Sequence, residues 1–316
     1  MRGQSLCSLA LLVAAGCATD PAPPAAAAPG VDASAGSGGS AGSAGSGGSS
    51  ATDAGSDSSG ATGGSAGSGG VGGTGGSSLL DASDGSSAPV PGDLIDLSNW
   101  KLTLPVGDNG VPAEIVQPQL ATFSLNPYFV VNVARDGVVF RAHAGGVTTP
   151  GSDYPRSELR EMKNLGADEA AWSTFNGVHT LTATVTITHL PIAKPHVVAA
   201  QIHDASDDVI MVRLEGEHLF VEGGGQELGD LDPAYRLGTP FTLSIRAAGG
   251  RIVVFYDDTG IPKVDIDSVT DGCYFKIGAY TQSNPSRGDA PDAYGEVVVR
   301  DLTLTHYDVT GGVQVD

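Results

Sequence analysis

Three short segments of the sequence carry polar side chains whose chemistry suits an acidic sugar. They are RSELRE at residues 156–161, QIH at residues 201–203 and YFKIGAYTQ at residues 274–282. Guanidinium and amide groups bind carboxylates, and imidazole and phenol groups move protons. Together the segments predict a site that holds an anionic substrate and removes a proton from it.

Each segment has the alternating pattern of a β-strand, in which every second side chain points to the same face. In the third segment Phe275, Ile277 and Ala279 would face a core. The polar residues would then line one groove across a sheet: Arg156, Glu158 and Arg160 from the first segment, Gln201 and His203 from the second, and Lys276, Gly278, Tyr280 and Gln282 from the third.

The first third of the chain has the composition of a linker. Residues 1–92 hold 23 of the 46 glycines, and most of the remainder is Ser, Ala, Thr, Pro and Asp. Such a segment buries too little apolar surface to offset the entropy lost on folding. We predict a disordered Gly/Ser/Ala-rich linker at residues 18–92 and one folded domain, long enough for a sizeable core, at residues 93–316.

The N-terminus has the features of an export signal. Arg2 precedes an apolar run at residues 6–15 that is too short to span a membrane. The run ends in AAGC at residues 14–17, which resembles a bacterial lipobox with Ala where Leu is usual. We expect a signal peptide at residues 1–17, lipidation of Cys17, and an exported lipoprotein facing the cell surface or periplasm; plain secretion is the alternative.

The cysteine count excludes an internal disulfide in the mature domain. Cys7 would be removed with the signal peptide and Cys17 would carry the lipid, so Cys273 stands alone. Its place at the start of an alternating strand predicts a packed, inert thiol.

The charge balance limits the partners. The chain has a net charge of −20; residues 1–92 carry −5, which leaves −15 for the domain. This excess argues against nucleic acid and against an acidic membrane surface, so a membrane contact is expected only through the lipid anchor. A polyanionic substrate fits only if cations gather in the groove, where Arg156, Arg160, Lys276 and His203 are the candidates.

The folded part reads as an all-β domain. About ten alternating segments are separated by Gly, Pro and Asp clusters, with one short helix expected around residues 114–121. This spacing indicates an antiparallel β-sandwich or jelly roll. The expected strands cover residues 97–105, 137–144, 156–163, 178–190, 197–203, 209–215, 218–222, 241–247, 251–257, 274–282 and 295–307.

Four motifs in order, WKLTLP at residues 100–105 and then RSELRE, QIH and YFKIGAYTQ, resemble the alginate lyases of polysaccharide lyase family 7. The resemblance covers nearly all of residues 97–307. It implies a jelly roll whose concave sheet binds a uronate polysaccharide. It also implies catalytic roles for Arg156 and Gln201, which would neutralise the uronate carboxylate, and for His203 and Tyr280, which would handle the proton. Positions that line or support the cleft are Glu158, Arg160, Lys276 and Gln282.

Such a lyase removes the C5 proton of a uronate and expels the 4-linked oxygen. Neutralising the carboxylate must come first, because proton removal builds a second negative charge onto it. For mannuronate Tyr280 could be both base and acid, and for guluronate His203 would be the base. The Ile202 form of QIH resembles members that accept guluronate-containing blocks. No metal or cofactor is expected, because the guanidinium supplies the charge.

Three other functions remain open from the sequence. A lyase could act on another uronan such as polyglucuronate. A jelly roll could be a non-catalytic carbohydrate-binding module, although only Trp100 and Trp172 offer indole platforms. A glycoside hydrolase would need two carboxylates placed across the scissile bond. The segment that comes closest to such a pattern is VDIDS at residues 264–268, and its sequence is more typical of the edge of a loop. A monomer is expected.

Overall fold

The structure, a computed structural model, describes residues 88–307 and 313–314. The predicted signal peptide, Cys17 and residues 18–87 of the predicted linker lie outside the described residues. Within the described part, no helix has the length and apolar character needed to cross a membrane.

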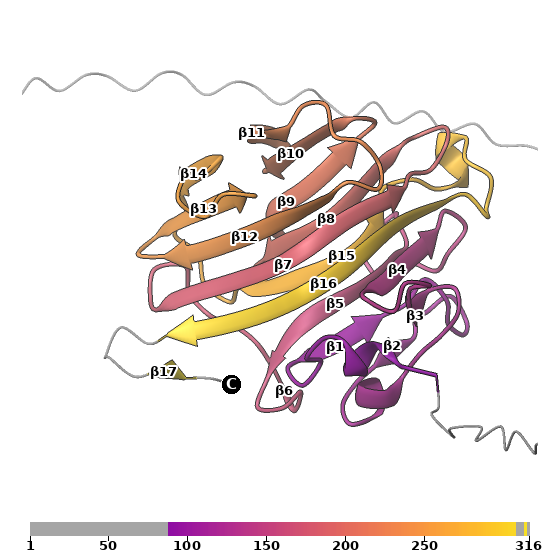
Figure 1. Cartoon of the computed structure of the whole chain (residues 1–316), viewed down its shortest axis with the longest axis horizontal. Helices are drawn as coiled ribbons and strands as arrows, with labels where there is room; N and C mark the ends of the chain where they lie inside the picture. The colour runs from indigo at the N-terminus through magenta and orange to yellow at the C-terminus, as the bar shows by residue number, and fades with distance from the viewer. Residues whose placement is uncertain (1–87, 308–312, 315–316) are drawn as a thin grey trace, which may run out of the picture. The chain divides into compact units, whose positions relative to one another are not determined.

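Two antiparallel sheets form a β-sandwich, as the sequence predicts (Figure 1). Sheet A runs, in spatial order, through β11 (Gln226–Asp232), β10 (His218–Gly223), β9 (Asp208–Glu215), β8 (His196–His203), β15 (Tyr274–Thr281), β5 (Arg156–Lys163), β1 (Trp100–Thr103) and β2 (Glu114–Ile115), with β6 (Asp168–Glu169) paired to β5. Sheet B runs through β14 (Val264–Asp267), β13 (Arg251–Tyr256), β12 (Pro240–Ala248), β7 (Val178–His189), β16 (Tyr294–Tyr307), β4 (Val138–His143) and β3 (Phe129–Val131), with β17 (Val313–Gln314) paired to β16. Three short 3-10 helices are η1 (Pro91–Asp93), η2 (Gln119–Thr122) and η3 (Pro285–Arg287).

Alternation along the strands builds the core between the sheets. In β7 the side chains of Leu181, Val185 and Ile187 are fully buried, and the residues that alternate with this buried set are threonines. In β15 the side chains of Phe275 and Ile277 are likewise fully buried. The β-branched and aromatic residues that favour strands therefore also supply the apolar face that joins the two sheets. Because the core takes one face of β15, its other face is left for polar groups.

The structure adds strands β3, β6 and β11, which the sequence did not predict, and it corrects two segments that were assigned otherwise. The helix expected at residues 114–121 is wrong: β2 pairs with β1 there, and only the four residues of η2 are helical. Pro118 lies between the two elements and has no backbone N–H to donate to a longer helix. The segment that begins at Val264, expected to be a loop edge, is strand β14, which pairs with β13.

Cys273 has the environment that the sequence predicts. Its side chain is fully buried in the core cluster, and burial raises the pKa of its thiol to about 12. A thiol with this pKa is protonated at neutral pH, so Cys273 is a packing residue and not a nucleophile.

A bulge in β15 separates its two polar ends. Between Ile277 and Tyr280 the strand contains one more residue than its partner β8, in which Ala200 and Val198 are opposite. Gly278 lies inside this bulge with φ of 148°. A Cβ there would lie 2.4 Å from the Ser157 carbonyl oxygen of β5. Only glycine allows β5 and β15 to approach this closely.

Replacing Gly278 should therefore destabilise the fold. Gly278→Ala combines an unfavourable φ with a clash against backbone atoms, and we expect it to lower the free energy of unfolding by about 3 kcal/mol. Gly216→Ala is the matched control, because Gly216 also has positive φ (62°) but open space around it; its cost should be about 1 kcal/mol. Urea denaturation measures both, and equal losses would show that β5 does not crowd Gly278.

Candidate active site

A groove of about 390 Å³ lies on the face of sheet A that points away from the core. Its floor comes from β5, β8 and β15, which are neighbours in the sheet. The loop at residues 149–152 borders it on one side, and residues 206–208, at the start of β9 and just before it, border it on another. Most of the polar side chains predicted from the three sequence segments line this single groove: Arg156, Arg160, Gln201, His203, Lys276 and Tyr280.

One buried carboxylate organises the floor. Glu158 is only 1% exposed and accepts hydrogen bonds from three side chains on three strands. Nη1 of Arg156 donates at 3.2 Å, Nζ of Lys276 lies at 3.1 Å, and Nε2 of Gln201 donates to the other carboxylate oxygen. Glu158 therefore holds the groups that the sequence predicts for binding a substrate carboxylate, and it lies below the groove instead of lining it.

The charges around Glu158 keep it ionised. Burial alone would raise its pKa, but the charges of Lys276 and Arg156 and the Gln201 hydrogen bond outweigh it and lower the pKa below the usual value. Burial also lowers the pKa of Lys276, and the negative charge of Glu158 opposes that shift. Each buried charge thus compensates another, which is the condition under which ionised groups remain under a groove.

Arg156 and Tyr280 form a contact pair at one end of the groove. The guanidinium carbon lies 3.9 Å from the centroid of the Tyr280 ring. Ser152 joins both residues, because its Oγ lies 3.1 Å from Nη2 of Arg156 and 3.0 Å from the Tyr280 hydroxyl. The sequence prediction did not include Ser152, for which the only signal was its place four residues before Arg156, next to Gly151.

His203 is held as a neutral base. Its Nδ1 donates to the carbonyl oxygen of Asp204 at 2.8 Å, which leaves the lone pair on Nε2. Burial is the main cause that lowers the pKa of His203, so the imidazole is uncharged at neutral pH. The ring stacks on Tyr274, a second groove residue that the sequence reading did not assign to the site, with centroids 5.2 Å apart.

Arg160 lies at the His203 end of the groove and not beside Tyr280. Its guanidinium carbon is 4.0 Å from the Tyr274 ring centroid, and Nη2 contacts Glu169 at 3.2 Å. The cation against Tyr280 is therefore Arg156. Gln282, predicted to share the groove, follows the end of β15, is 6% exposed and does not line the groove.

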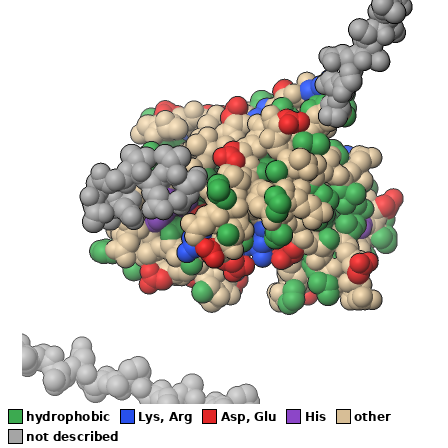
Figure 2. Space-filling model, turned by 90° about the horizontal axis from the view of Figure 1, so that it is seen from below, with side chains coloured by type: hydrophobic (Ala, Val, Ile, Leu, Met, Phe, Trp, Pro, Cys, Tyr) green, Lys and Arg blue, Asp and Glu red, His purple; other side chains and the backbone are tan. Residues whose placement is uncertain are grey.

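Cations do gather in the groove, but acids accompany them. Four lysine and arginine side chains line the groove: Lys101, Arg156, Arg160 and Lys276. The acidic residues Glu114, Asp207 and Asp208 line it as well, and Glu158 lies beneath it. Figure 2 shows acidic side chains spread over one face of the molecule, in keeping with the net charge of −20. A polyanion would therefore be held by the positions of particular donors and not by a broad positive surface.

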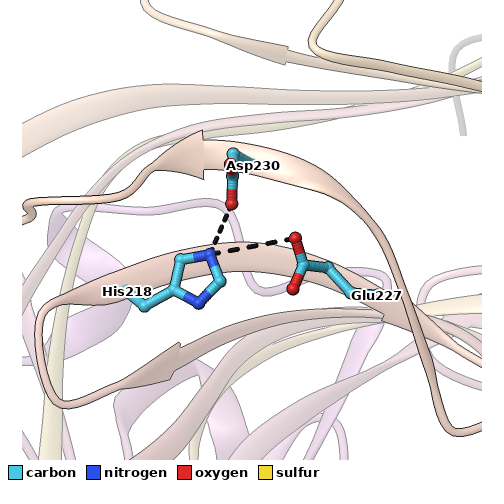
Figure 3. Close-up of side chains that lie close together, drawn as sticks. All are labelled: His218, Glu227 and Asp230. Atoms are coloured by element: carbon cyan, nitrogen blue, oxygen red, sulfur yellow. Dashed lines mark hydrogen bonds and ion pairs between the residues drawn. The ribbon is translucent and has the colours of Figure 1, made fainter.

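Three potential metal ligands lie outside the groove. His218, Glu227 and Asp230 meet on the β10–β11 hairpin (Figure 3). Nε2 of His218 already contacts Asp230 and lies 4.0 Å from Glu227. A hydrogen bond between the His218 imidazole and the exposed Asp230 carboxylate accounts for this cluster, and none of the three lines the groove. A metal-free active site stays a prediction.

Comparisons with known proteins agree with this geometry. A family model described as alginate lyase matches residues 95–306. The structure of AlgAT5, an alginate lyase from polysaccharide lyase family 7, is 56% identical, covers 69% of this chain and 99% of its own, and has a TM-score of 0.67. The alginate lyase structure from Corynebacterium sp. is 45% identical, covers 69% of this chain and 98% of its own, and has a TM-score of 0.66.

A curated relative points the same way. An alginate lyase from Klebsiella pneumoniae is 28% identical over 294 residues, which cover 72% of this chain and 95% of the relative. The residues that the family model matches, 95–306, include all three strands that form the floor of the groove. This chain belongs to the alginate lyases of polysaccharide lyase family 7.

Proposed function

We propose that the protein cleaves alginate by β-elimination and prefers guluronate-containing blocks. One observation carries the proposal: a carboxylate-binding pair, Arg156 and Gln201, lines the same groove as a neutral imidazole, His203, and a phenol, Tyr280. Binding a uronate needs the first pair, and moving its proton needs the second.

The pair that binds the carboxylate would act first. Arg156 brings a positive charge, and the Gln201 amide retains one N–H because Glu158 takes only one of the two. Both would bind the uronate carboxylate and stabilise the extra negative charge that develops on it as the C5 proton leaves. Removal of one such donor typically costs about 3 kcal/mol of transition-state stabilisation.

For guluronate, two proton transfers would accompany the cleavage of the bond. Nε2 of His203 takes the C5 proton, the C4–C5 double bond forms, and the bond from C4 to the linking oxygen breaks. The Tyr280 hydroxyl gives its proton to the leaving oxygen. The lowered pKa of His203 keeps the lone pair of Nε2 available at neutral pH.

A preference for guluronate has two supports. In guluronate the C5 hydrogen and the leaving oxygen lie on opposite sides, so two separate groups are needed, and the groove offers His203 and Tyr280 on different strands. A solved alginate lyase that is 26% identical, covers 69% of this chain and 100% of its own and has a TM-score of 0.60 contains the product GGG in a Tyr-to-Phe variant.

We also propose that the protein is exported. The support is in the sequence, where Arg2, the apolar run at residues 6–15 and Cys17 are arranged as in a bacterial lipoprotein signal. A lipid on Cys17 and the Gly/Ser-rich segment that follows it would tether the lyase to a membrane surface.

Ultraviolet absorbance of the unsaturated product tests the function. The purified protein should release product from polyguluronate faster than from polymannuronate, and faster than from polyglucuronate. Tyr280→Phe removes the proton donor while keeping the ring against Arg156, so kcat should fall at least about 100-fold while polymer affinity stays within about threefold.

Tyr294→Phe is the matched control, because Tyr294 lies on β16 outside the groove, and its activity should match the wild type. Turnover retained in Tyr280→Phe would exclude the proposed proton donor. Polymer binding by the wild type without any product would instead identify a carbohydrate-binding module.

A groove carboxyl should give the reaction a pH-dependent KM. Burial and the charge of Asp207 raise the pKa of Asp208 to about 6, so Asp208 is neutral below that pH and negative above it. Ionised Asp208 repels the polyanion, and KM should rise roughly two- to threefold from pH 5 to pH 8. Asp208→Asn should remove this rise, whereas Asp108→Asn, at an exposed site outside the groove, should keep it. An unchanged rise in Asp208→Asn would assign the titration to another group.

A further inference from the structure

Beyond the Tyr280 end of the groove, two basic side chains converge on one phenol. Nζ of Lys194 lies 3.0 Å from the hydroxyl oxygen of Tyr154, and Nε of Arg287 donates to the same oxygen at 3.2 Å. The Tyr154 ring packs edge-on against the Tyr280 ring, with centroids 6.4 Å apart. The pair of cations is therefore one aromatic ring away from the residue that we assign to proton transfer.

Loops from three parts of the chain are fastened together to build this arrangement. The Asp289 carboxylate, 5% exposed, accepts the backbone N–H groups of Ile192, Ala193 and Lys194 at 2.7, 2.8 and 2.9 Å. It also accepts the Ser283 hydroxyl. These bonds lower the pKa of Asp289 despite its burial, so it is ionised at neutral pH. These hydrogen bonds therefore fix the position of the loop with Lys194 relative to the loop with Arg287.

A second bond ties these loops to the one that carries Tyr154. Nδ2 of Asn284, at the start of η3, donates to the carbonyl oxygen of Asp153 at 3.0 Å. Arg287 is the last residue of η3, and Tyr154 follows Asp153 directly. The phenol and both cations are consequently positioned before any ligand arrives, which reduces the entropy that binding would cost.

The two cations differ from those in the groove floor in having no acidic partner among the residues that the structure describes. Arg156 and Lys276 share Glu158, and Arg160 contacts Glu169. Lys194 and Arg287 form no ion pair within 4.0 Å among the described residues. Both Nη atoms of Arg287 also make no hydrogen bond within that part of the chain. In a protein of charge −20, two adjacent uncompensated cations mark a place for an anionic group.

We propose that Lys194 and Arg287, held in place by Tyr154, bind the carboxylate of a further uronate residue, on the Tyr280 side of the bond that is cleaved. The inference rests on the proposed function and adds a subsite to it. A chain that reaches past Tyr280 meets a planar guanidinium fork and an ammonium group, both matched to a carboxylate. Short oligomers that do not reach Lys194 and Arg287 would gain no affinity from them.

Oligouronates of defined length test the subsite. In the full-length protein, the double variant Lys194→Ala/Arg287→Ala should raise KM for a hexasaccharide roughly tenfold, with kcat within about twofold of the wild type. KM for the shortest oligomer that is cleaved should change less than about twofold. The variant should also show a weaker dependence of kcat/KM on salt, because two ion contacts are gone.

Arg236→Ala/Lys263→Ala is the control with the same change of charge. Both residues are exposed, form no ion pair among the described residues and lie outside the groove. This variant should match the wild type on both oligomers. Equal losses on short and long oligomers in the Lys194→Ala/Arg287→Ala variant, or equal losses in the control, would overturn the subsite.

The experiment separates this inference from the proposed function. If the wild type releases no unsaturated product from any uronan, the proposed function fails, and calorimetric affinity for the hexasaccharide replaces KM as the readout. A roughly tenfold weaker affinity in the Lys194→Ala/Arg287→Ala variant than in the control would then support the subsite, and equal affinities would contradict it.

Discussion

The buried carboxylate of Glu158 is the constraint on which the groove depends. It lies where β5, β8 and β15 run side by side, and donors from all three strands meet on it. Without this negative charge, Arg156 and Lys276 would be two like charges in a mostly buried layer, a situation that typically costs about 3–5 kcal/mol. Glu158 therefore fixes the position of the cation and the amide that a uronate carboxylate would meet, and it does so without touching the substrate itself.

The sheet and the loops contribute different groups to the site. The strands give the cation, amide, imidazole and phenol rigid positions, which is what precise proton transfer requires. The loops add Ser152 at Tyr280 and the Lys194–Arg287 pair beyond it. Because acids nearly balance the floor cations, an acidic polymer would be held by a few placed donors and not by a broad positive surface. The cations without an acidic partner among the described residues, Lys194 and Arg287, lie at one end.

The sequence predicted what depends on local alternation. The faces of β5, β8 and β15 follow from a period of two, so six of the side chains that line the groove could be named from sequence, namely Arg156, Arg160, Gln201, His203, Lys276 and Tyr280, as could the buried Cys273. It could not predict what depends on contacts between distant segments. Ser152 joins the site only because its loop folds over the sheet, and the bulge at Gly278 appears only when β15 is paired with β8. The helix expected at residues 114–121 does not form, because residues 114 and 115 pair with β1 and Pro118 interrupts the segment before η2.

We have proposed that Arg156 cancels the charge of the substrate carboxylate, and a substrate without that charge tests this role most directly. Methyl-esterified oligouronate has no carboxylate charge to neutralise, so its C5 proton needs no help from a cation. Comparing wild type with Arg156→Ala, we expect kcat/KM to fall about 100-fold on the free acid but only a few-fold on the ester. An equal loss on both substrates would contradict charge neutralisation and leave Arg156 a structural residue.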